Sequence, residues 1–165
     1  MQAARARIAY LGSSTATDGG AELRLLHMAR KMRAEFEVTL FLPDQGPLFE
    51  VARAQGIEVE VAFFGARTAA DLKARGYQAD LMAANNVVAH VPDLNDFVEG
   101  FRILLAPTGV ATFEFHHVLN LIRRNQFDTI YHEHFSYLSL GTISRIFAAA
   151  GLSIFDVEEL PTHGG

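Results

Sequence analysis

Short apolar runs alternate with amphipathic segments along the first two thirds of the chain. The runs are rich in β-branched and aromatic residues and predict strands at residues 7–11, 36–42, 57–63, 79–83 and 109–115. The segments between them carry apolar residues at helical spacing and predict helices at residues 21–33, 48–54, 68–75 and 94–105. Such alternation is typical of parallel sheets with right-handed crossovers. We therefore expect an α/β fold with a doubly wound, mostly parallel sheet and helices on both faces.

The last third of the chain departs from this alternation. The expected elements are a helical turn, a helix that Gly151 caps and a final strand, at residues 118–124, 143–150 and 152–157. No internal repeat or Pro/Ser-rich linker separates the two regions. We therefore expect a single domain over residues 1–165.

Composition narrows the classes of function. Half of the 165 residues are hydrophobic and a fifth are charged, as in an ordinary globular domain. The net charge of −5 gives no reason to expect binding to nucleic acid or to an anionic membrane. The absence of cysteine excludes disulfides, thiolate nucleophiles and Cys-based zinc sites. Because no apolar run is long enough for a signal-peptide core or a membrane span, we expect a cytoplasmic protein.

A glycine-rich loop follows the first predicted strand. Residues 12–20 (GSSTATDGG) open the first predicted helix, where backbone N–H groups and the helix dipole can hold an anion. The loop is neither a GxGxxG fingerprint nor a P-loop. Its place at the carboxyl edge of the sheet makes Gly12 a candidate for cofactor binding. The alternative is that its glycines serve close packing alone.

Two amides and an imidazole follow the fourth predicted strand. Asn85, Asn86 and His90 emerge at the same carboxyl edge of the sheet and are candidates for ligand binding. The alternative is an Asn-rich turn with a structural role. In either case, Asp93 is expected to cap the following helix.

Titratable groups are densest in residues 126–137 (QFDTIYHEHFSY). A Tyr, a Glu and a His this close together can divide proton-transfer roles, with the carboxylate orienting the imidazole and the imidazole acting as base. A metal site is one alternative: His132 and His134 would share a face of a strand, and His116 and His117 would complete the coordination. An aromatic hairpin with satisfied histidines is another.

From residue 64 to residue 165 the chain closely resembles the SAM-dependent sugar C-methyltransferases. The motifs that carry the resemblance are AANNVVAHVPDLN (83–95), GVATFEF (109–115), QFDTIYHEHFSY (126–137) and ELPTHGG (159–165). Enzymes of this family methylate C3 of nucleotide-linked keto-deoxysugars and share a Rossmann-like sheet. The resemblance therefore implies S-adenosyl-L-methionine (SAM) as the cofactor and a small-molecule nucleotide sugar as the partner.

The same resemblance assigns roles to individual residues. It implies that the stretch around Asn85, Asn86 and His90 lines the SAM pocket. It also implies that Tyr131, Glu133 and His134 form the acid-base site that removes a proton beside the sugar carbonyl, with no metal ion.

Residues 5–62 resemble a different family, the amino-terminal domain of family 4 retaining glycosyltransferases of the two-Rossmann type. The motifs are RIAYLG (7–12), DGGAE (18–22), EVTL (37–40), QGPLF (45–49) and GIEV (56–59). In that family the glycine pair of the first loop approaches the donor diphosphate. The chain is therefore expected to be a hybrid of residues 1–62 and 63–165, joined near residues 59–64.

Several departures from the methyltransferase pattern bear on activity. The acidic-Gly loop for SAM and the Cys-rich zinc subdomain are missing, the family continues past residue 165 with a further lobe, and His117 stands where Pro is expected. Asp44 is the candidate acid for the ribose hydroxyls. We expect weak SAM affinity. A glycosyltransferase-like nucleotide-sugar binder, a non-enzymatic fragment and a catalytically inactive hybrid stay open, as does the oligomeric state.

Overall fold

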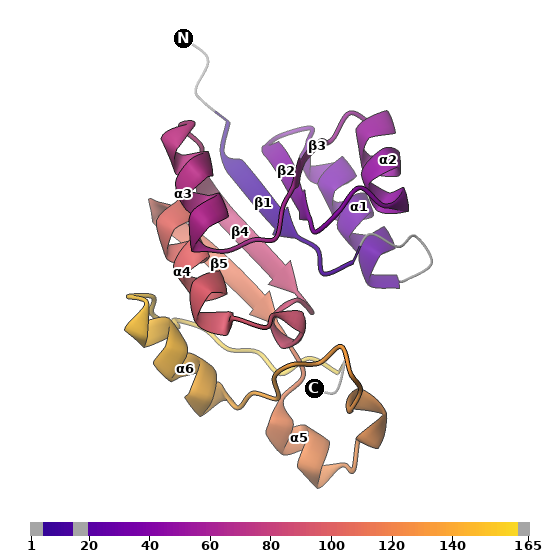
Figure 1. Ribbon diagram of the computed structural model, residues 1–165, viewed down its shortest axis with the longest axis vertical. Helices are drawn as coiled ribbons and strands as arrows, with labels where there is room; N and C mark the ends of the chain where they lie inside the picture. Colours follow the sequence, from indigo (N-terminus) through magenta and orange to yellow (C-terminus); the bar gives the residue numbers. More distant parts are fainter. Residues whose placement is uncertain (1–4, 15–19, 162–165) are drawn as a thin grey trace.

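A five-stranded parallel sheet forms the centre of the molecule (Figure 1). The computed structural model describes residues 5–14 and 20–161. The strand order is β3-β2-β1-β4-β5. The bounds are β1 Arg7–Leu11, β2 Glu37–Leu42, β3 Glu58–Val61, β4 Ala79–Asn85 and β5 Leu105–Glu114. The expected doubly wound, Rossmann-like sheet is confirmed.

Helices cover both faces of this sheet (Figure 1). Helices α1 (Gly20–Met32) and α2 (Pro47–Ala54) pack on one face, while α3 (Ala66–Ala74), α4 (Leu94–Leu104) and α6 (Leu140–Ala149) pack on the other. Three short elements lie beyond the carboxyl ends of the strands: the 3-10 helices η1 (Val88–His90) and η2 (Phe127–Thr129), and helix α5 (Val118–Arg123). None of the helices in the described ranges is long and apolar enough to cross a membrane.

Each central strand contributes to two cores because successive side chains point to opposite faces. Ile8 and Tyr10 of β1 join the core beneath α1 and α2, whereas Ala9 and Leu11 join the core beneath α3 and α4. Burial on both faces explains why the strands are nearly continuous apolar runs.

The sheet reverses its winding between β1 and β4. Strand β1 pairs with β2 on one side and with β4 on the other, so the connections that leave its two neighbours run in opposite directions. Ligands of doubly wound sheets bind at such a switch point, beyond the carboxyl ends of the strands.

Two expected strand boundaries were wrong. Strand β5 begins at Leu105, directly after α4, four residues before the expected start at Gly109. Its register against β4 shifts between Ala79 and Leu81, and a Cβ at Gly109 would lie 2.9 Å from the Ala79 carbonyl oxygen. The residues before Gly109 that favour a turn belong instead to a bulge inside the strand. The sequence pattern alone does not distinguish such a bulge from a loop. Strand β3, in contrast, is shorter than expected.

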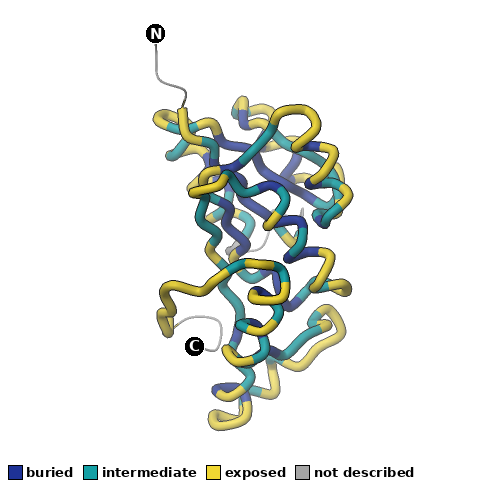
Figure 2. The backbone as a smooth tube through the Cα atoms, turned by 90° about the vertical axis from the view of Figure 1, so that its left-hand side faces the viewer, coloured by how far each residue is buried: buried dark blue, intermediate teal, exposed yellow. Residues whose placement is uncertain are grey.

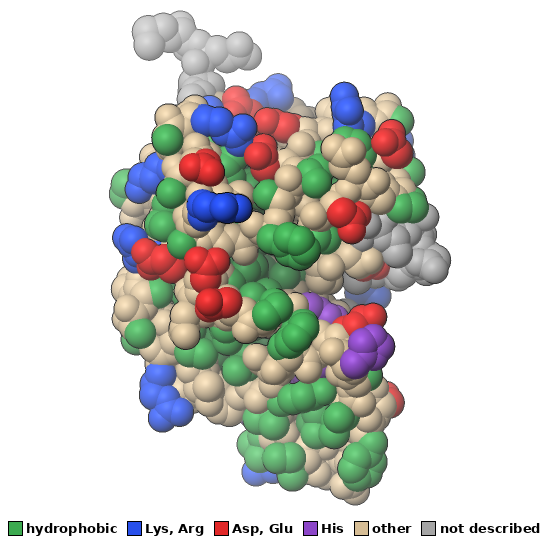
Figure 3. Space-filling view, in the orientation of Figure 1, with side chains coloured by type: hydrophobic (Ala, Val, Ile, Leu, Met, Phe, Trp, Pro, Cys, Tyr) green, Lys and Arg blue, Asp and Glu red, His purple; other side chains and the backbone are tan. Residues whose placement is uncertain are grey.

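The expected final strand at residues 152–157 was also wrong. This segment has no regular secondary structure, and Phe155 and Val157 are exposed. An alternating pattern makes a strand only where a neighbouring backbone pairs with it. Exposure is high through much of the chain after β5 (Figure 2), where apolar side chains gather at one end of the surface (Figure 3).

Parts of two expected motifs lie outside the described residues. These are residues 15–19 of the glycine loop, including Asp18 and Gly19, and residues 162–165 at the end of the chain.

Candidate active site

A cleft of about 80 Å³ lies at the switch point. The ends of β1, β4 and β5 and the first turns of α1 line it, through Tyr10, Leu11, Gly12, Ser13, Glu22, Arg24, Leu25, Met28, Ala83, Asn85, Asn86 and Glu114. The structure thus brings together three of the candidate cofactor-binding residues: Gly12, Asn85 and Asn86.

Gly12 is closely packed as well as exposed to the cleft. Its amide donates a hydrogen bond to the Phe41 carbonyl oxygen at 3.0 Å. A Cβ at this position would lie 3.1 Å from the side chains of Leu25 and Leu42. Packing therefore accounts for a glycine here, and the same residue also lines the cleft.

Asn86 turns the chain out of β4. Its φ of 55° lies in the left-handed region, which asparagine tolerates better than most residues. Its amide donates to the Glu114 carbonyl oxygen at 2.8 Å. The turn carries Asn85 and Asn86 to the mouth of the cleft and leads into η1, which ends at His90.

The cleft is acidic. Glu22 and Glu114 line it together with one cation, Arg24. This balance favours a cationic ligand over a diphosphate. Glu22 and Glu114 were not among the residues singled out from the sequence as ligand-binding candidates, although Glu114 ends a predicted buried strand. Asp44 is exposed in the turn after β2 and is not among the residues that line the cleft.

A cluster of aromatic rings surrounds His134. The centroid of its ring lies 4.0 Å from that of Tyr131, 4.5 Å from that of His116 and 4.7 Å from that of His90. Figure 3 shows histidine side chains beside acidic ones on this face. We call His90, His116, Tyr131, His134 and Tyr137 the histidine cluster.

Backbone hydrogen bonds fix the segment that carries His134. The amides of Phe135 and Ser136 donate to the Ala89 carbonyl oxygen at 2.7 and 3.3 Å. Further along, the Val118 amide donates to the Leu138 carbonyl oxygen at 3.0 Å. These bonds attach the segment to η1 and to the start of α5, which follow β4 and β5.

One hydrogen bond determines the tautomer of His134. Its Nδ1 lies 2.7 Å from the Thr129 carbonyl oxygen. Because a carbonyl oxygen only accepts, Nδ1 carries the hydrogen and the Nε2 of a neutral ring has a free lone pair. That Nε2 is buried and has no hydrogen-bond partner.

The neighbouring histidines are held neutral. Burial, followed by the nearby His134 and His90, lowers the pKa of His116 to about 4. Burial and then His134 lower the pKa of His90, while Glu133 and Glu22 act in the opposite direction. Glu22, the smallest of these influences on His90, also lines the cleft.

Glu133 is placed differently from the expected orienting carboxylate. Its Oε1 lies 3.9 Å from Nε2 of His132, whose side chain is 90% exposed. The hydrogen-bond partner of His134 is instead the backbone of Thr129. Glu133 also contributes, after burial, to raising the pKa of Tyr131.

The metal alternative required His132 and His134 to share a strand face. Residues 131–135 form a turn and an irregular segment, with His132 outside and His134 within the histidine cluster. Among residues 5–14 and 20–161, no group of three or more His, Cys, Asp or Glu side chains is arranged to hold a metal ion.

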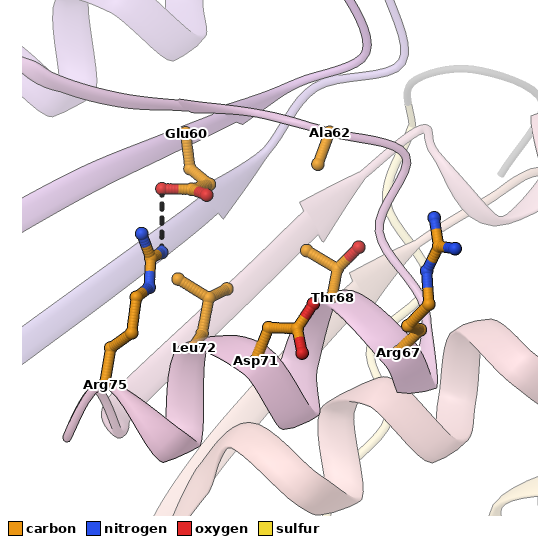
Figure 4. Close-up of a pocket in the computed structure, with 7 residues that line it drawn as sticks. All are labelled: Glu60, Ala62, Arg67, Thr68, Asp71, Leu72 and Arg75. Carbon is orange, nitrogen blue, oxygen red and sulfur yellow. Dashed lines mark ion pairs between the residues drawn. The ribbon is translucent and has the colours of Figure 1, made fainter.

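A larger cavity of about 420 Å³ lies between β3 and α3 (Figure 4). Glu60, Arg67, Asp71 and Arg75 supply charges of both signs, and Arg75 pairs with Glu60 at 3.0 Å. None of the candidate site residues lines this cavity. It lies at the outer edge of the sheet, away from the switch point.

Comparison with known proteins identifies the family of this chain. Residues 24–157, most of the chain, match the methyltransferase domain family. The chain belongs to the methyltransferase domain family. It is 39% identical over 115 residues to the C-methyltransferase NovU of Streptomyces niveus, a match that covers 70% of this chain and 27% of NovU. The methyltransferase domain described here thus spans about a quarter of that relative.

Solved structures share the fold. The YcgJ protein of Bacillus subtilis is similar with a TM-score of 0.61 and 13% identity, over 89% of this chain and 62% of that one. The DhpI–SAM–HEP complex is similar with a TM-score of 0.56 and 17% identity, over 90% of this chain and 71% of that one. Membership of the methyltransferase domain family supports SAM as the cofactor of this domain.

The chemistry of the cleft fits SAM. SAM carries a sulfonium and an ammonium cation, and Glu22 and Glu114 offer carboxylates at the cleft. Asn85, Asn86 and Ser13 add polar groups for the remainder of the molecule. Small-molecule sites usually enclose roughly 300–1,000 Å³, so the cleft of about 80 Å³ would have to widen to take the whole of SAM.

Proposed function

We propose that this methyltransferase domain serves a SAM-dependent C-methylation, in which a proton is removed beside the carbonyl of a nucleotide-linked keto-deoxysugar. The observation that carries the proposal is the buried, unpartnered Nε2 of His134. It lies in the histidine cluster, whose His90 ends η1, and the turn at Asn85 and Asn86 that leads into η1 lines the acidic cleft. SAM, when bound, supplies an electrophilic methyl group.

The residues around His134 suit it to act as a general base. Nε2 accepts the proton from carbon, and the imidazolium keeps its Nδ1 hydrogen bond to the Thr129 carbonyl oxygen. That bond strengthens as the ring becomes charged, because charge-assisted hydrogen bonds are stronger than neutral ones. The ring of Tyr131, 4.0 Å away, covers the imidazole and limits access of water.

The substrate class rests on the sequence resemblance and on the similarity to NovU, which is a C-methyltransferase. The glycosyltransferase-like character of residues 5–62 stays a prediction. A nucleotide-sugar binder of that type would need to hold a diphosphate, which the two carboxylates of the cleft disfavour.

Solvent deuterium exchange at C3 of a nucleotide-linked 4-ketosugar tests the proposal. We expect His134→Ala to reduce the exchange rate by about 10²–10⁴-fold, the usual contribution of a general base. His132→Ala is the matched control and should stay within about threefold of wild type, because the His132 side chain is 90% exposed. Added zinc should change nothing.

Three results would contradict the proposal. Loss of exchange on addition of a chelator, or equal losses in the two variants, would favour a metal shared by the two imidazoles. No exchange by the wild-type protein would show that the chain is catalytically inactive.

A further inference from the structure

The histidine cluster contains a second imidazole nitrogen without a partner. His116 is only 3% exposed, and its Nε2 is buried with no hydrogen bond. Buried polar atoms in folded proteins almost always have partners, so an orphaned one indicates a group that is supplied from outside the chain. The proposed base, His134, is the other imidazole in this condition.

The two unpartnered nitrogens belong to neighbouring rings. The centroids of His116 and His134 are 4.5 Å apart and their planes are inclined by 30°. Rings at this distance and inclination pack nearly face to face, so their in-plane nitrogens do not hydrogen-bond to each other. Their spacing does allow them to contact adjacent atoms of one small molecule.

The chain connects His116 to the cleft. Strand β5 ends at Glu114, which lines the cleft, and His116 follows two residues later. His116 is therefore close in the chain to a residue that lines the cleft, and its ring contacts that of His134.

We propose that Nε2–H of His116 donates a hydrogen bond to the carbonyl oxygen of the substrate while His134 removes the proton from the neighbouring carbon. The proposal rests on the proposed function. The C–H bond breaks, its electron pair moves into the enolate, the proton remains on Nε2 of His134, and the negative charge that develops on oxygen is stabilised by His116.

A neutral ring suits this role. The pKa of His116 is lowered to about 4, so it is uncharged near pH 7 and presents one N–H as a donor. A cationic ring at this position would oppose the second positive charge that forms on His134, 4.5 Å away.

Because both nitrogens are buried, substrate must displace a part of the protein to reach them. Tyr131 is 42% exposed, and its ring packs against that of His134 at 4.0 Å. Its neighbours Ile130 and Phe135 are exposed as well. Movement of this ring opens the cluster without disturbing the buried strands.

Two measurements on the full chain test the proposal. The first is the ¹⁵N chemical shift of the His116 imidazole, with and without a dTDP-linked 4-ketosugar. We expect Nε2 to carry the hydrogen and to shift when the ketosugar binds. The second is the rate of deuterium exchange at C3 for His116→Phe, which keeps a flat ring but has no donor. We expect a loss of about 100-fold in kcat, as for removal of one oxyanion donor, with KM within about threefold.

His116→Gln restores a side-chain donor, so its exchange rate should be at least tenfold higher than that of His116→Phe. If the His116 ring had a purely structural role, an amide would not restore the rate. An unchanged ¹⁵N shift, or exchange by His116→Phe within threefold of wild type, would overturn the role of His116. A shift at His116 without any wild-type exchange would instead overturn the proposed function and leave this contact standing.

Discussion

Burial of His116 ties the stability of the protein to pH. A histidine in the unfolded chain titrates near its ordinary pKa of about 6.5, whereas the pKa of the buried His116 is about 4. Between these values the unfolded state binds a proton that the folded state does not bind. Stability is therefore fully present above about pH 6.5 and falls as the pH falls toward 4.

We expect His116→Phe to weaken this pH dependence. Between pH 7 and pH 5 the wild-type protein should lose about 1–2 kcal/mol more free energy of unfolding than the variant, at roughly 1.4 kcal/mol per pKa unit. Urea unfolding at the two pH values measures the difference. His132→Phe is the control, and it should keep the wild-type dependence because its ring is exposed. Parallel losses in wild type and His116→Phe would contradict the prediction.

At the scale of single residues, the sequence predicted which residue types lie close together but not which hydrogen bonds they form. The density of titratable groups drew attention to residues 126–137, the family resemblance singled out His134, and the structure places it in the histidine cluster. His116 entered only as a possible metal ligand, because burial decides its character and burial depends on the packing of distant segments. The backbone oxygen of Thr129 carries no sequence signal at all.

At the scale of elements, close contact between α3 and α4 depends on a glycine. A Cβ at Gly100 of α4 would lie 2.8 Å from the Phe64 ring and 2.9 Å from the Gly65 backbone. The Phe64 ring also packs edge-on against Phe97 and Phe101, with centroids 5.8 and 5.4 Å apart, so it has little room to move.

We expect Gly100→Ala to destabilise the protein by about 1–3 kcal/mol through overpacking. Gly141→Ala in α6 is the matched control, since its Cβ would meet only Ser139 Oγ at 3.9 Å. That change should stabilise by about 0.5–1 kcal/mol, because alanine favours the helix. Thermal unfolding of both variants gives the comparison, and a Gly100→Ala protein as stable as wild type would be the contrary result.

Element boundaries followed the sequence where a local signal marks them. Asp93 was expected to cap α4, and its side chain accepts from the Asp96 amide at 3.0 Å. The expected strand at residues 152–157 was wrong because pairing, unlike capping, depends on a partner remote in the sequence. The early start of β5 was missed for the same reason.

At the scale of the whole molecule, the sheet topology sets the position of the cleft. The charges that line the cleft set its affinity for SAM. We expect SAM to bind weakly and Glu114→Gln to weaken it by about tenfold, since one attractive charge near a cation is lost. Asp44→Asn tests the acid that the sequence predicts to hold the ribose hydroxyls of SAM. Glu50→Gln, at an exposed position on α2, is the control for both acid variants. Isothermal titration with SAM gives the affinities, and tight binding unaffected by either acid variant would refute this assignment.

The central place of β1 also affects how the chain folds. Strand β1 is the first of the five strands in the chain, yet one of its two neighbours is β4, and the pair Ile8↔Leu81 joins residues 73 positions apart. Closing so long a loop costs conformational entropy before the hydrogen bonds between β1 and β4 form and stabilise the pair. The β1–β2 and β4–β5 pairs span shorter separations and can form earlier. We therefore expect the slow step of folding to be the docking of these two halves along β1 and β4, where the cleft is created.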